Sequence, residues 1–460
     1  MSTAPVTATR TGHPAFAAAL RSLDERLDVL REEGRYRRFV ELERPAPGAP
    51  YVRLADGSAR VVVDWCSNDY LGMSQHPAVV EAACQALAEH GVGSGGTRNI
   101  AGSHLLVRAL EDELADLHCQ EAALVFTSGF IANEASLRVL GSLLEGCVIL
   151  SDERNHASMI DGIRSSRAQR AIFRHNDVEH LRELLEALPP DVPRIVAFES
   201  IYSMDGDFGP LRDLCAVAAE YGALTYLDET HAAGAYGHEG AGVAQALGVT
   251  DMLTVVQGSL AKGYGGLGGF IVGPATIIDT VRSHASGFIF TTSLPPAIAA
   301  AGLASVRHLR GSDRERAALT RSGRTLREAF ARAGVTPMPS DSHILPVLVP
   351  GAERCRAVAQ RLLNEHAIYV QPINYPSVPR GAERLRIAPT PAHTPAHAEA
   401  LASALAELLR DVDDGSANGP ANGNGSANGN GHTNGNGSAN GNGHANGNGS
   451  ANGRPAKQAM

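Results

Sequence analysis

The chain has 460 residues, of which 43% are apolar, so it can bury the core of one large domain or of two to three ordinary ones. Its formal net charge of −9 leaves no basic face for neutralising phosphates, which argues against nucleic acid as a partner. No segment is apolar over the roughly 20 residues of a membrane span, and the N-terminus lacks a signal peptide's apolar stretch. We therefore expect no membrane partner and a cytoplasmic location.

The chain begins with a pattern that predicts an amphipathic helix and a hairpin-like arm over 1–60. Between about Thr97 and Gly273, β-branched runs alternate with helical patterns, which predicts an α/β domain with a mostly parallel sheet over 61–303. The expected strands are ALVF, CVILSD, AIFRH, RIVAFES, LTYLDE, MLTVV and GFIVG. From about Ala304 a helix-rich region leads to SHILPVLV and IYVQPIN, which predicts a smaller α+β domain over 304–412.

After Asp414 the composition changes to Asn, Gly, Ser and Ala, with a twelve-residue repeat that starts at Ser426 and Ser438. A segment with so few apolar side chains cannot offset the entropy of ordering, so we expect 413–460 to be a disordered tail. The six cysteines are scattered without paired spacing, which predicts buried free thiols. We expect no metal site.

Two residues that follow predicted strands point to a type of chemistry. Asp228 ends the run LTYLD, and Lys262 follows a β-rich run and precedes the glycine-rich segment GYGGLGG. Taken alone, such an aspartate is as often structural or a metal ligand as a cofactor partner. The glycines match neither a dinucleotide fingerprint nor a phosphate loop. An acid before a lysine, each at a strand end, is typical of pyridoxal-phosphate enzymes, in which the lysine forms a Schiff base.

Longer motifs make this interpretation specific. With DETHAAGAYG, GSLAKGYGGLGG, SDERNHASMIDGIR and FESIYSMDGDFGPL, the chain resembles the α-oxoamine synthases, which are fold type I pyridoxal-phosphate enzymes. GSGGTRNIAGSH and QPINYPSVPRGAERLRIAPTP are similar to the 5-aminolevulinate synthase branch. The resemblance runs from about Arg31 to Leu409. It implies an aminotransferase-like α/β fold and a homodimer with shared active sites.

The resemblance also implies which residues hold pyridoxal 5'-phosphate. Lys262 forms the covalent link, His156 stacks on the pyridine face, Asp228 pairs with the ring nitrogen, and His231 hydrogen-bonds the phenolic oxygen. These four are the expected catalytic residues. Other expected cofactor contacts are Ser128, Phe130, Ser203, Ser259 and, toward the phosphate in the partner subunit, Thr291 and Thr292. Ser259 replaces a threonine that is usual before the family lysine, which keeps the hydroxyl.

The substrates implied by the resemblance are glycine and succinyl-CoA. Two arginines suit their two carboxylates, since a guanidinium fork accepts both oxygens. Arg386 matches the position that binds the glycine carboxylate, and Arg37 the one near the succinyl carboxylate. The remaining expected substrate contacts are Asn68 near the condensing atoms, Thr97, Asn99, Ile100 and Ser377 around the acyl group, and Ser151, Ile160 and Arg170 at CoA. Ser377 stands where many members have threonine, and Arg170 replaces a lysine.

The implied reaction is a condensation followed by loss of carbon dioxide. Glycine displaces Lys262 from the cofactor, and the freed amine removes a Cα proton. The carbanion attacks succinyl-CoA, and 5-aminolevulinate, CoA and CO2 are released. Other α-oxoamine synthases remain open as alternatives, namely the 8-amino-7-oxononanoate synthase, 2-amino-3-ketobutyrate CoA ligase and serine palmitoyltransferase types. So does a catalytically silent cofactor-binding module. The product can feed tetrapyrroles or a specialised metabolite.

Overall fold

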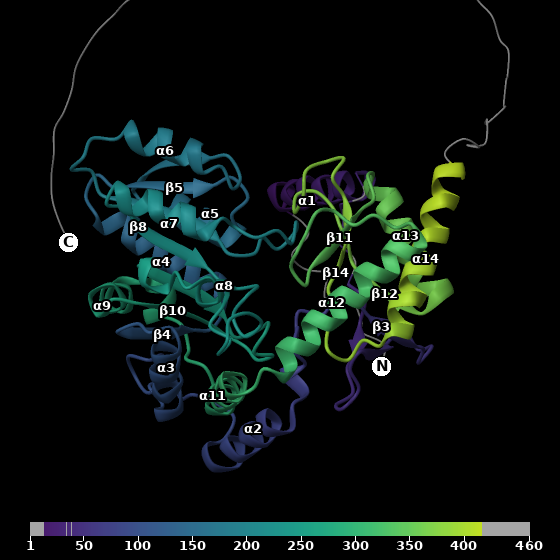
Figure 1. The fold of residues 1–460 in the computed structure, drawn as a ribbon, viewed down its shortest axis with the longest axis horizontal. Helices are drawn as coiled ribbons and strands as arrows, with labels where there is room; N and C mark the ends of the chain where they lie inside the picture. The colour runs from purple at the N-terminus through teal and green to yellow at the C-terminus, as the bar shows by residue number, and fades with distance from the viewer. Residues whose placement is uncertain (1–12, 34, 38, 416–460) are drawn as a thin grey trace, which may run out of the picture. The chain divides into compact units, whose positions relative to one another are not determined.

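The computed structural model describes residues 13–33, 35–37 and 39–415. Its largest sheet has seven strands in the order β4-β10-β9-β8-β7-β5-β6 (Figure 1). Only β10 runs against its neighbours, so the predicted mostly parallel sheet is confirmed. All seven predicted runs form strands, namely β4 (Ala122–Phe126), β5 (Val148–Asp152), β6 (Gln169–Phe173), β7 (Arg194–Glu199), β8 (Leu224–Asp228), β9 (Val255–Ser259) and β10 (Gly269–Gly273).

Both faces of this sheet are covered because its strands are apolar on both sides, as expected for buried parallel strands. Successive side chains of β7 alternate between the faces: Val196 and Phe198 join one core, and Ile195 and Ala197 join the other. The first, here the α3 core, is covered by α3 (Leu105–Leu117), α6 (Val178–Glu186), α7 (Leu211–Glu220) and α11 (Pro296–Gly311). The second, the α4 core, is covered by α4 (Gly129–Leu143), α5 (Ala157–Ser165), α9 (Ala275–His284) and α10 (Ser286–Ile289).

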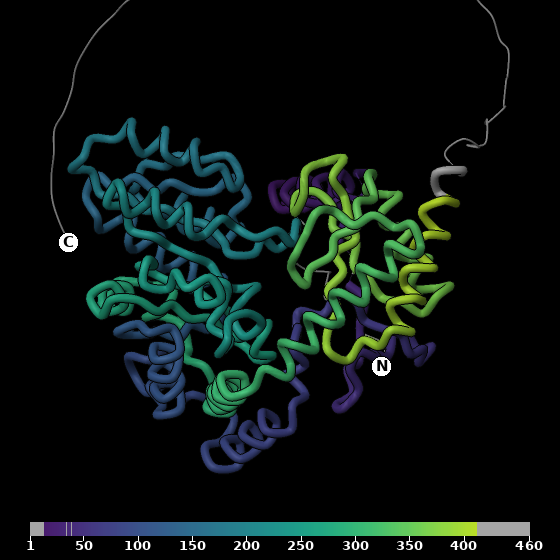
Figure 2. Tube along the Cα trace, viewed as in Figure 1, coloured from purple at the N-terminus to yellow at the C-terminus, as the bar shows by residue number. Residues whose placement is uncertain are grey.

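The N-terminal and C-terminal segments share a second sheet, in the order β1-β2-β3-β12 (Figure 2). Its strands β1 (Leu42–Glu43), β2 (Tyr51–Leu54) and β3 (Val61–Asp64) are antiparallel, whereas β12 (Ile368–Tyr369) pairs in parallel with β3. A third sheet joins β11 (Leu345–Leu348), β14 (Arg384–Ile387) and β13 (Pro372–Ile373). The predicted N-terminal helix is α1 (Pro14–Glu32), and the arm after it pairs as expected.

A C-terminal core lies beside these two sheets. It includes the buried side chains of Trp65, Phe330, Leu345, Leu362 and Leu405. Its helices are α12 (Arg314–Ala333), α13 (Ala352–His366) and α14 (Pro395–Gly415). The remaining helical elements are η1 (Met73–Gln75), α2 (Pro77–His90), α8 (Val243–Leu247) and η2 (Thr250–Met252).

Several segments join the C-terminal core to the α3 core, among them Ile344–Leu345 and Ile387–Ala388. Residues 65–70 connect Trp65 of the C-terminal core to Tyr70 of the α3 core. Helix α12 makes another connection, with Leu319 in the α3 core and Leu326 in the C-terminal core. The predicted limit at 303/304 falls inside α11, whose Leu303 and Val306 both pack in the α3 core. The domain limits stay a prediction.

All six cysteines are free, as expected. The expectation that they are buried is wrong for Cys84 and Cys119, which are exposed, because Cys84 lies on the outer side of α2 and Cys119 in the turn after α3. Most of the predicted tail, from residue 416 onward, lies outside the described residues. Among the helices that are described, none is long and apolar enough to cross a membrane.

Candidate active site

The predicted catalytic residues follow parallel strands that end at one edge of the large sheet. Asp228 ends β8, His231 follows it, and Lys262 lies in the turn after β9. His156 follows β5 and is the N-cap residue of α5. Ligands of such sheets bind at the carboxyl ends of the strands, so the fold places these four side chains where the sequence predicted them.

The glycine-rich segment after Lys262 packs against the loop that carries His231. A Cβ at Gly263 would lie 2.2 Å from the carbonyl oxygen of Ala233, and one at Gly265 would lie 2.2 Å from the backbone nitrogen of Ser74. Only glycine allows this close approach of backbones. The glycines therefore fix the position of Lys262 against neighbouring loops, which explains why they match no phosphate-binding pattern.

The amine of Lys262 is held in an unusual electrostatic environment. Burial, and then the positive charge of Arg386, lower the pKa of Lys262 to about 8, although Asp228 and Glu199 oppose the shift. Within the described ranges the amine has no hydrogen-bond or ion-pair partner. A substantial fraction of the amine is thus neutral near physiological pH, which a nucleophile or a general base requires.

Asp228 is buried and has two hydrogen-bond donors. The amide of Asn133 donates to one carboxylate oxygen at 2.7 Å, and the backbone N–H of Thr230 donates to the other at 2.7 Å. Asn133 is itself oriented, because it accepts from Tyr226 at 3.0 Å and donates to Ser158 at 3.0 Å. Such neutral donors keep a buried carboxylate ionised without a cation, so its charge remains available to a protonated ring nitrogen.

The same network reaches His156 through Ser158, whose hydroxyl lies 2.8 Å from Nδ1 of His156. The imidazole is exposed, but burial of its surroundings lowers the pKa of His156. The ring of Phe130 lies edge-on to it, with centroids 6.3 Å apart. A neutral, oriented imidazole at the carboxyl ends of the strands fits the role expected for His156, which is to stack on the pyridine ring.

His231 belongs to a buried polar cluster that also contains Arg386. The hydroxyl of Tyr70 hydrogen-bonds Nδ1 of His231 at 2.7 Å and accepts from Nη2 of Arg386 at 2.9 Å. Arg386 also donates to the Asn68 side chain at 3.1 Å and to the carbonyl of Ser203 at 2.6 Å. Burial, followed by the charges of Lys262 and Arg386, lowers the pKa of His231, so its ring is neutral.

These contacts leave part of the Arg386 guanidinium available. Of its five N–H donors, Nε is taken by Ser203, and Nη1 and Nη2 each make one of the hydrogen bonds above. One N–H of Nη1 has no partner among the described residues, and the second N–H of Nη2 makes only a long contact of 3.4 Å with Nδ1 of His231. A carboxylate that replaces this long contact can bind both terminal nitrogens.

Glu199, at the end of β7, is a second buried carboxyl group next to Asp228. The two residues are direct partners in the β7–β8 ladder. Its Oε1 accepts the backbone N–H of His156 at 2.5 Å. Burial, and then the charge of Asp228, raise the pKa of Glu199 well above its ordinary value. Of the two neighbouring carboxyl groups, Glu199 is therefore the one whose protonated form is favoured.

The start of α4 offers donors to an anion. Ser128 is its N-cap residue, and its hydroxyl accepts from the backbone N–H of Ile131 at 3.2 Å. Among described residues, the N–H groups of Gly129 and Phe130 have no hydrogen-bond partner. Ser259 is close, since a Cβ on Gly129 would lie 3.4 Å from its Cβ. A helix N-terminus with free N–H groups and a nearby hydroxyl suits a phosphate.

Gly269 allows this arrangement, because a Cβ there would lie 2.5 Å from the backbone nitrogen of Gly129. The site thus fits pyridoxal phosphate on three counts: unpartnered N–H groups for the phosphate, an ionised acid for the ring nitrogen, and a lysine amine with a lowered pKa. Ser128, Phe130, Ser203 and Ser259 all lie at the same edge of the sheet as the four catalytic residues.

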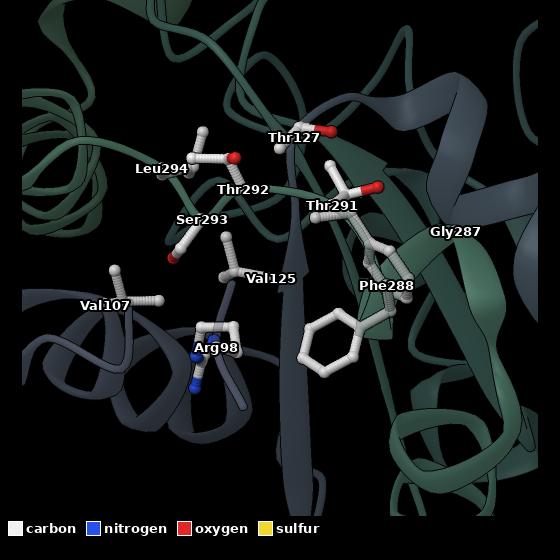
Figure 3. A pocket seen from close by; sticks show the side chains of 11 residues that line it. Arg98, Val107, Val125, Thr127, Gly287, Phe288, Thr291, Thr292, Ser293 and Leu294 are labelled. Atoms are coloured by element: carbon white, nitrogen blue, oxygen red, sulfur yellow. The ribbon is translucent and has the colours of Figure 1, made fainter. Parts of the chain in front are cut away.

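Thr291 and Thr292 lie in a separate pocket (Figure 3). Arg98 also lines it, and a bidentate ion pair with Glu111, at 2.7 and 2.9 Å, holds its guanidinium. Thr97 forms a β-bridge with Thr292, so two predicted contact loops lie side by side. Within the described part of the chain, no hydrogen bond joins either threonine to Lys262, Asp228 or Arg386.

The remaining predicted substrate residues lie in three places. Asn99 and Ile100 are exposed on the Thr97 loop, and Ile100 is 82% exposed. Arg37 and Ser377 are also exposed, and the arm before Arg37 contacts the Ser377 loop through Arg35, whose guanidinium lies 5.3 Å from the Tyr375 ring centroid.

The residues expected at CoA share one part of the large sheet. Ser151 is buried in β5, Ile160 is half-buried in α5, and Arg170 is exposed on the edge strand β6. The substrate contacts of all these residues stay predictions.

Sequence reasoning missed Tyr70, Asn133 and Glu199. Tyr70 stands two positions after Asn68 in the segment CSNDYLG, and Glu199 stands inside the motif FESIYSMDGDFGPL. The signal for Glu199 was its position at a strand end. No local pattern marks Asn133, which lies in the middle of α4 and reaches Asp228 across 95 residues of sequence.

Comparisons with known proteins agree with this geometry. The model of the aminotransferase class I and II family matches residues 60–405. A 5-aminolevulinate synthase of Rhizobium meliloti (strain 1021) is 52% identical over 369 residues, which are 80% of this chain and 91% of that protein. A 5-aminolevulinate synthase of Rhodobacter capsulatus is 49% identical over 376 residues, or 81% and 92% of the two chains.

Among solved structures, a serine palmitoyltransferase from S. paucimobilis has a TM-score of 0.78 at 29% identity, covering 86% of this chain and 99% of that one. An 8-amino-7-oxononanoate synthase from Francisella tularensis has a TM-score of 0.66 at 23% identity, covering 77% and 99%, and shows the fold alone.

Fold and site together define a fold type I enzyme of the aminotransferase class I and II family. Within that class, the extent and identity of the matches are decisive. The chain belongs to the 5-aminolevulinate synthases.

Proposed function

We propose that the strand-end site condenses glycine with succinyl-CoA to 5-aminolevulinate, CoA and CO2, with pyridoxal 5'-phosphate as its cofactor. The chain is a pyridoxal-phosphate-dependent acyltransferase. One observation carries the residue roles: Arg386 is fixed beside His231 and close enough to Lys262 to lower its pKa. A carboxylate-binding cation next to an amine with a lowered pKa is what an amino-acid substrate requires.

Each residue has a role that follows from its surroundings. Bound pyridoxal phosphate supplies an electron-withdrawing ring that stabilises negative charge at the α-carbon of glycine. Asp228, held by Asn133, would pair with the ring nitrogen and keep it protonated. The neutral His231 would hydrogen-bond the phenolic oxygen, and His156 would stack on the ring. Ser128, Phe130, Ser203 and Ser259 complete the cofactor contacts.

The unpartnered Nη1 N–H of Arg386 and the Nη2 N–H that makes only a 3.4 Å contact with His231 bind the glycine carboxylate, and this fixes the orientation of the α-carbon. Lys262 then removes the Cα proton as a general base, for which a pKa of about 8 is well matched to neutral pH. Asn68, already bonded to Arg386, lies next to the condensing atoms. Arg37 and Ser377 bind the succinyl carboxylate, and Ser151, Ile160 and Arg170 contact CoA.

The active enzyme is a homodimer in which each site takes residues from both subunits. Supporting this, Thr97, Asn99, Ile100, Thr291 and Thr292 form a group of their own, apart from the hydrogen-bonded cluster around Arg386. Two large apolar side chains in these loops are highly exposed, Ile100 at 82% and Phe290 at 80%, and a subunit interface would cover them. The cytoplasmic location expected from the sequence is part of this proposal.

The lysine assignment has an unusually clean test, because the sequence contains only two lysines, Lys262 and Lys457. Borohydride reduction of the holoenzyme, followed by peptide mass spectrometry, should place the cofactor mass on Lys262 alone. Lys262→Ala should form no product yet still bind cofactor noncovalently, whereas the matched control Lys457→Arg should keep full turnover. Turnover by Lys262→Ala would overturn the assignment.

Shared sites are tested by complementation. A Lys262→Ala chain and a Thr291→Ala/Thr292→Ala chain are each expected to be inactive as homodimers. If Lys262 and the threonines of one site come from different subunits, a co-expressed heterodimer has one site with both defects and one intact site, so activity returns. If each site is built from one chain, every heterodimer site carries a defect, and no activity returns.

The choice of acyl-CoA distinguishes a 5-aminolevulinate synthase from the other α-oxoamine synthases. Initial rates with acetyl-, succinyl- and pimeloyl-CoA, each with glycine, alanine or serine, should favour succinyl-CoA with glycine. Arg37→Leu should raise KM for succinyl-CoA by about tenfold or more, the worth of a lost charge-assisted hydrogen bond. Equal rates with all three thioesters would contradict the proposal.

A further inference from the structure

A cluster of two histidines and one glutamate lies outside the active site. His76 precedes α2, His308 lies in α11, and Glu315 is in the first turn of α12. One potential ligand atom from each residue lies within 4.8 Å of the other two. Nε2 of His308 is 3.2 Å from Oε1 of Glu315, and the rings of His76 and His308 are 4.1 Å apart between centroids.

Two details indicate that this cluster can bind a metal ion. Nδ1 of His76 is buried and has no hydrogen-bond partner among the described residues. A buried polar atom left without a partner costs about 1–3 kcal/mol. The second oxygen of Glu315 accepts from the Ser312 hydroxyl at 2.6 Å, which orients the carboxylate as the outer-shell partners of metal ligands do.

From these residues we propose a binding site for a divalent transition metal, most simply Zn²⁺, on His76, His308 and Glu315. Imidazole and carboxylate are preferred ligands of zinc, and three protein ligands leave a position for water. Ligand atoms of a tetrahedral zinc site are about 3.4 Å apart. Since the potential ligand atoms here lie within 4.8 Å of one another, side-chain rotation has to close each pair by at most about 1.4 Å.

The place of the cluster in the fold gives the metal a structural role. Glu315 lies at the start of α12, the helix that runs from Leu319 in the α3 core to Leu326 in the C-terminal core. His76 lies just after residues 65–70, another of the segments that join these two cores. A bound metal therefore ties the base of α12 to α2 and α11. The nearby positive charge of Arg314 opposes cation binding, so the ionised Glu315 is essential to the site.

The test is a titration of the full-length, EDTA-treated holoenzyme with Co²⁺, followed by its visible ligand-field absorption. All preparations carry Cys84→Ser, Cys119→Ser, His432→Gln and His444→Gln, which remove exposed thiols and the two tail histidines as other ligands. We expect one saturable Co²⁺ per chain, displaced by Zn²⁺. His308→Gln and Glu315→Gln should each weaken binding by at least about tenfold.

His90→Gln is the matched control, because the ring of His90 also packs against a histidine, His104, with centroids 4.6 Å apart, and its Nε2 lies 3.7 Å from Oε2 of Glu89. It should bind Co²⁺ as the parent does. Zn²⁺ should also raise the melting temperature of the parent and of His90→Gln, and leave that of Glu315→Gln unchanged. Absence of a stoichiometric site in the parent, or equal binding by all variants, would overturn the proposal.

Discussion

Glu199 and Asp228 are direct partners at the carboxyl ends of β7 and β8, so two acidic side chains share one buried edge of the sheet. Two such groups do not both ionise readily in a buried site. The carboxylate of Asp228 accepts two hydrogen bonds, whereas burial beside Asp228 raises the pKa of Glu199, so the site favours the charge on Asp228 and the proton on Glu199. This division lets the site hold one defined negative charge opposite the ring nitrogen.

A neutral Glu199 has a direct test. Glu199→Gln keeps an uncharged acceptor for the His156 N–H, so kcat/KM should stay within about threefold of the parent value. Glu199→Ala removes the acceptor and leaves a cavity, and kcat/KM should fall by about tenfold or more. Steady-state kinetics and the pH dependence of the cofactor absorption band measure both. Equal losses in the two variants would show that Glu199 is ionised.

Asn133 should control cofactor affinity through Asp228. Asn133→Ala removes a hydrogen bond to a charged group, worth about 1.5–3 kcal/mol, so the Kd for pyridoxal phosphate should rise at least tenfold. Equilibrium dialysis of the apoenzyme measures this. The control is Asn155→Ala, which removes a buried amide that contacts Ser151 and Ala197 instead. A similar rise in the control would indicate a general loss of structure.

Tyr70→Phe separates substrate binding from cofactor binding. The change removes a hydroxyl shared by Arg386, Asn68 and His231, so the glycine carboxylate site loses its alignment. KM for glycine should rise about tenfold, as expected for a hydrogen bond to a charged group, with little change in cofactor affinity. Tyr221→Phe, whose hydroxyl contacts Glu186, is the control and should leave KM unchanged.

The pH dependence of cofactor attachment should report the Lys262 amine. Because the neutral amine is the nucleophile, the rate at which apoenzyme takes up pyridoxal phosphate should rise through a midpoint near pH 8. Removing the positive charge of Arg386 by Arg386→Leu should move the midpoint to higher pH. Stopped-flow absorbance measures it. Arg380→Gln, which removes a partner of Glu33, should leave the midpoint in place.

His175 should make stability depend on pH. Burial alone would lower its pKa, but hydrogen bonds to Asp152 at 2.9 Å and Asp207 at 2.8 Å raise the pKa of His175 to about 9. The folded state thus binds a proton that the unfolded chain loses near pH 6.5. This stabilisation, up to about 3 kcal/mol, is complete below that pH and disappears as the pH rises through 9.

His175→Gln should therefore unfold at lower urea concentration than the parent at pH 6, and the gap should narrow toward pH 9. His180→Gln is the control, since its Nδ1 accepts a single backbone hydrogen bond at the exposed surface. A gap that stays constant with pH would mean that His175 is not charged in the folded state.

The fold was predictable where local pattern determines it. Strands such as β7 carry unbroken apolar runs, and Asp228 and Lys262 could be placed because both follow such runs. The predicted run IYVQPIN contains β12 and β13, but no local pattern indicates that β12 pairs with β3, so the sheet that joins them was not foreseen. The Tyr70, His231 and Arg386 cluster was missed because its members lie at least 155 residues apart in sequence. Only tertiary packing brings them together.

The buried side chain of Trp65 has one more consequence. It is the only tryptophan in the sequence, and it packs against His393 with ring centroids 3.9 Å apart. Burial lowers the pKa of His393 to about 4, so its ring is neutral at working pH. All indole emission therefore arises from one position in the C-terminal core. The efficiency of resonance energy transfer from Trp65 to a chromophore on Lys262 therefore reports the distance between these two residues, without any added label.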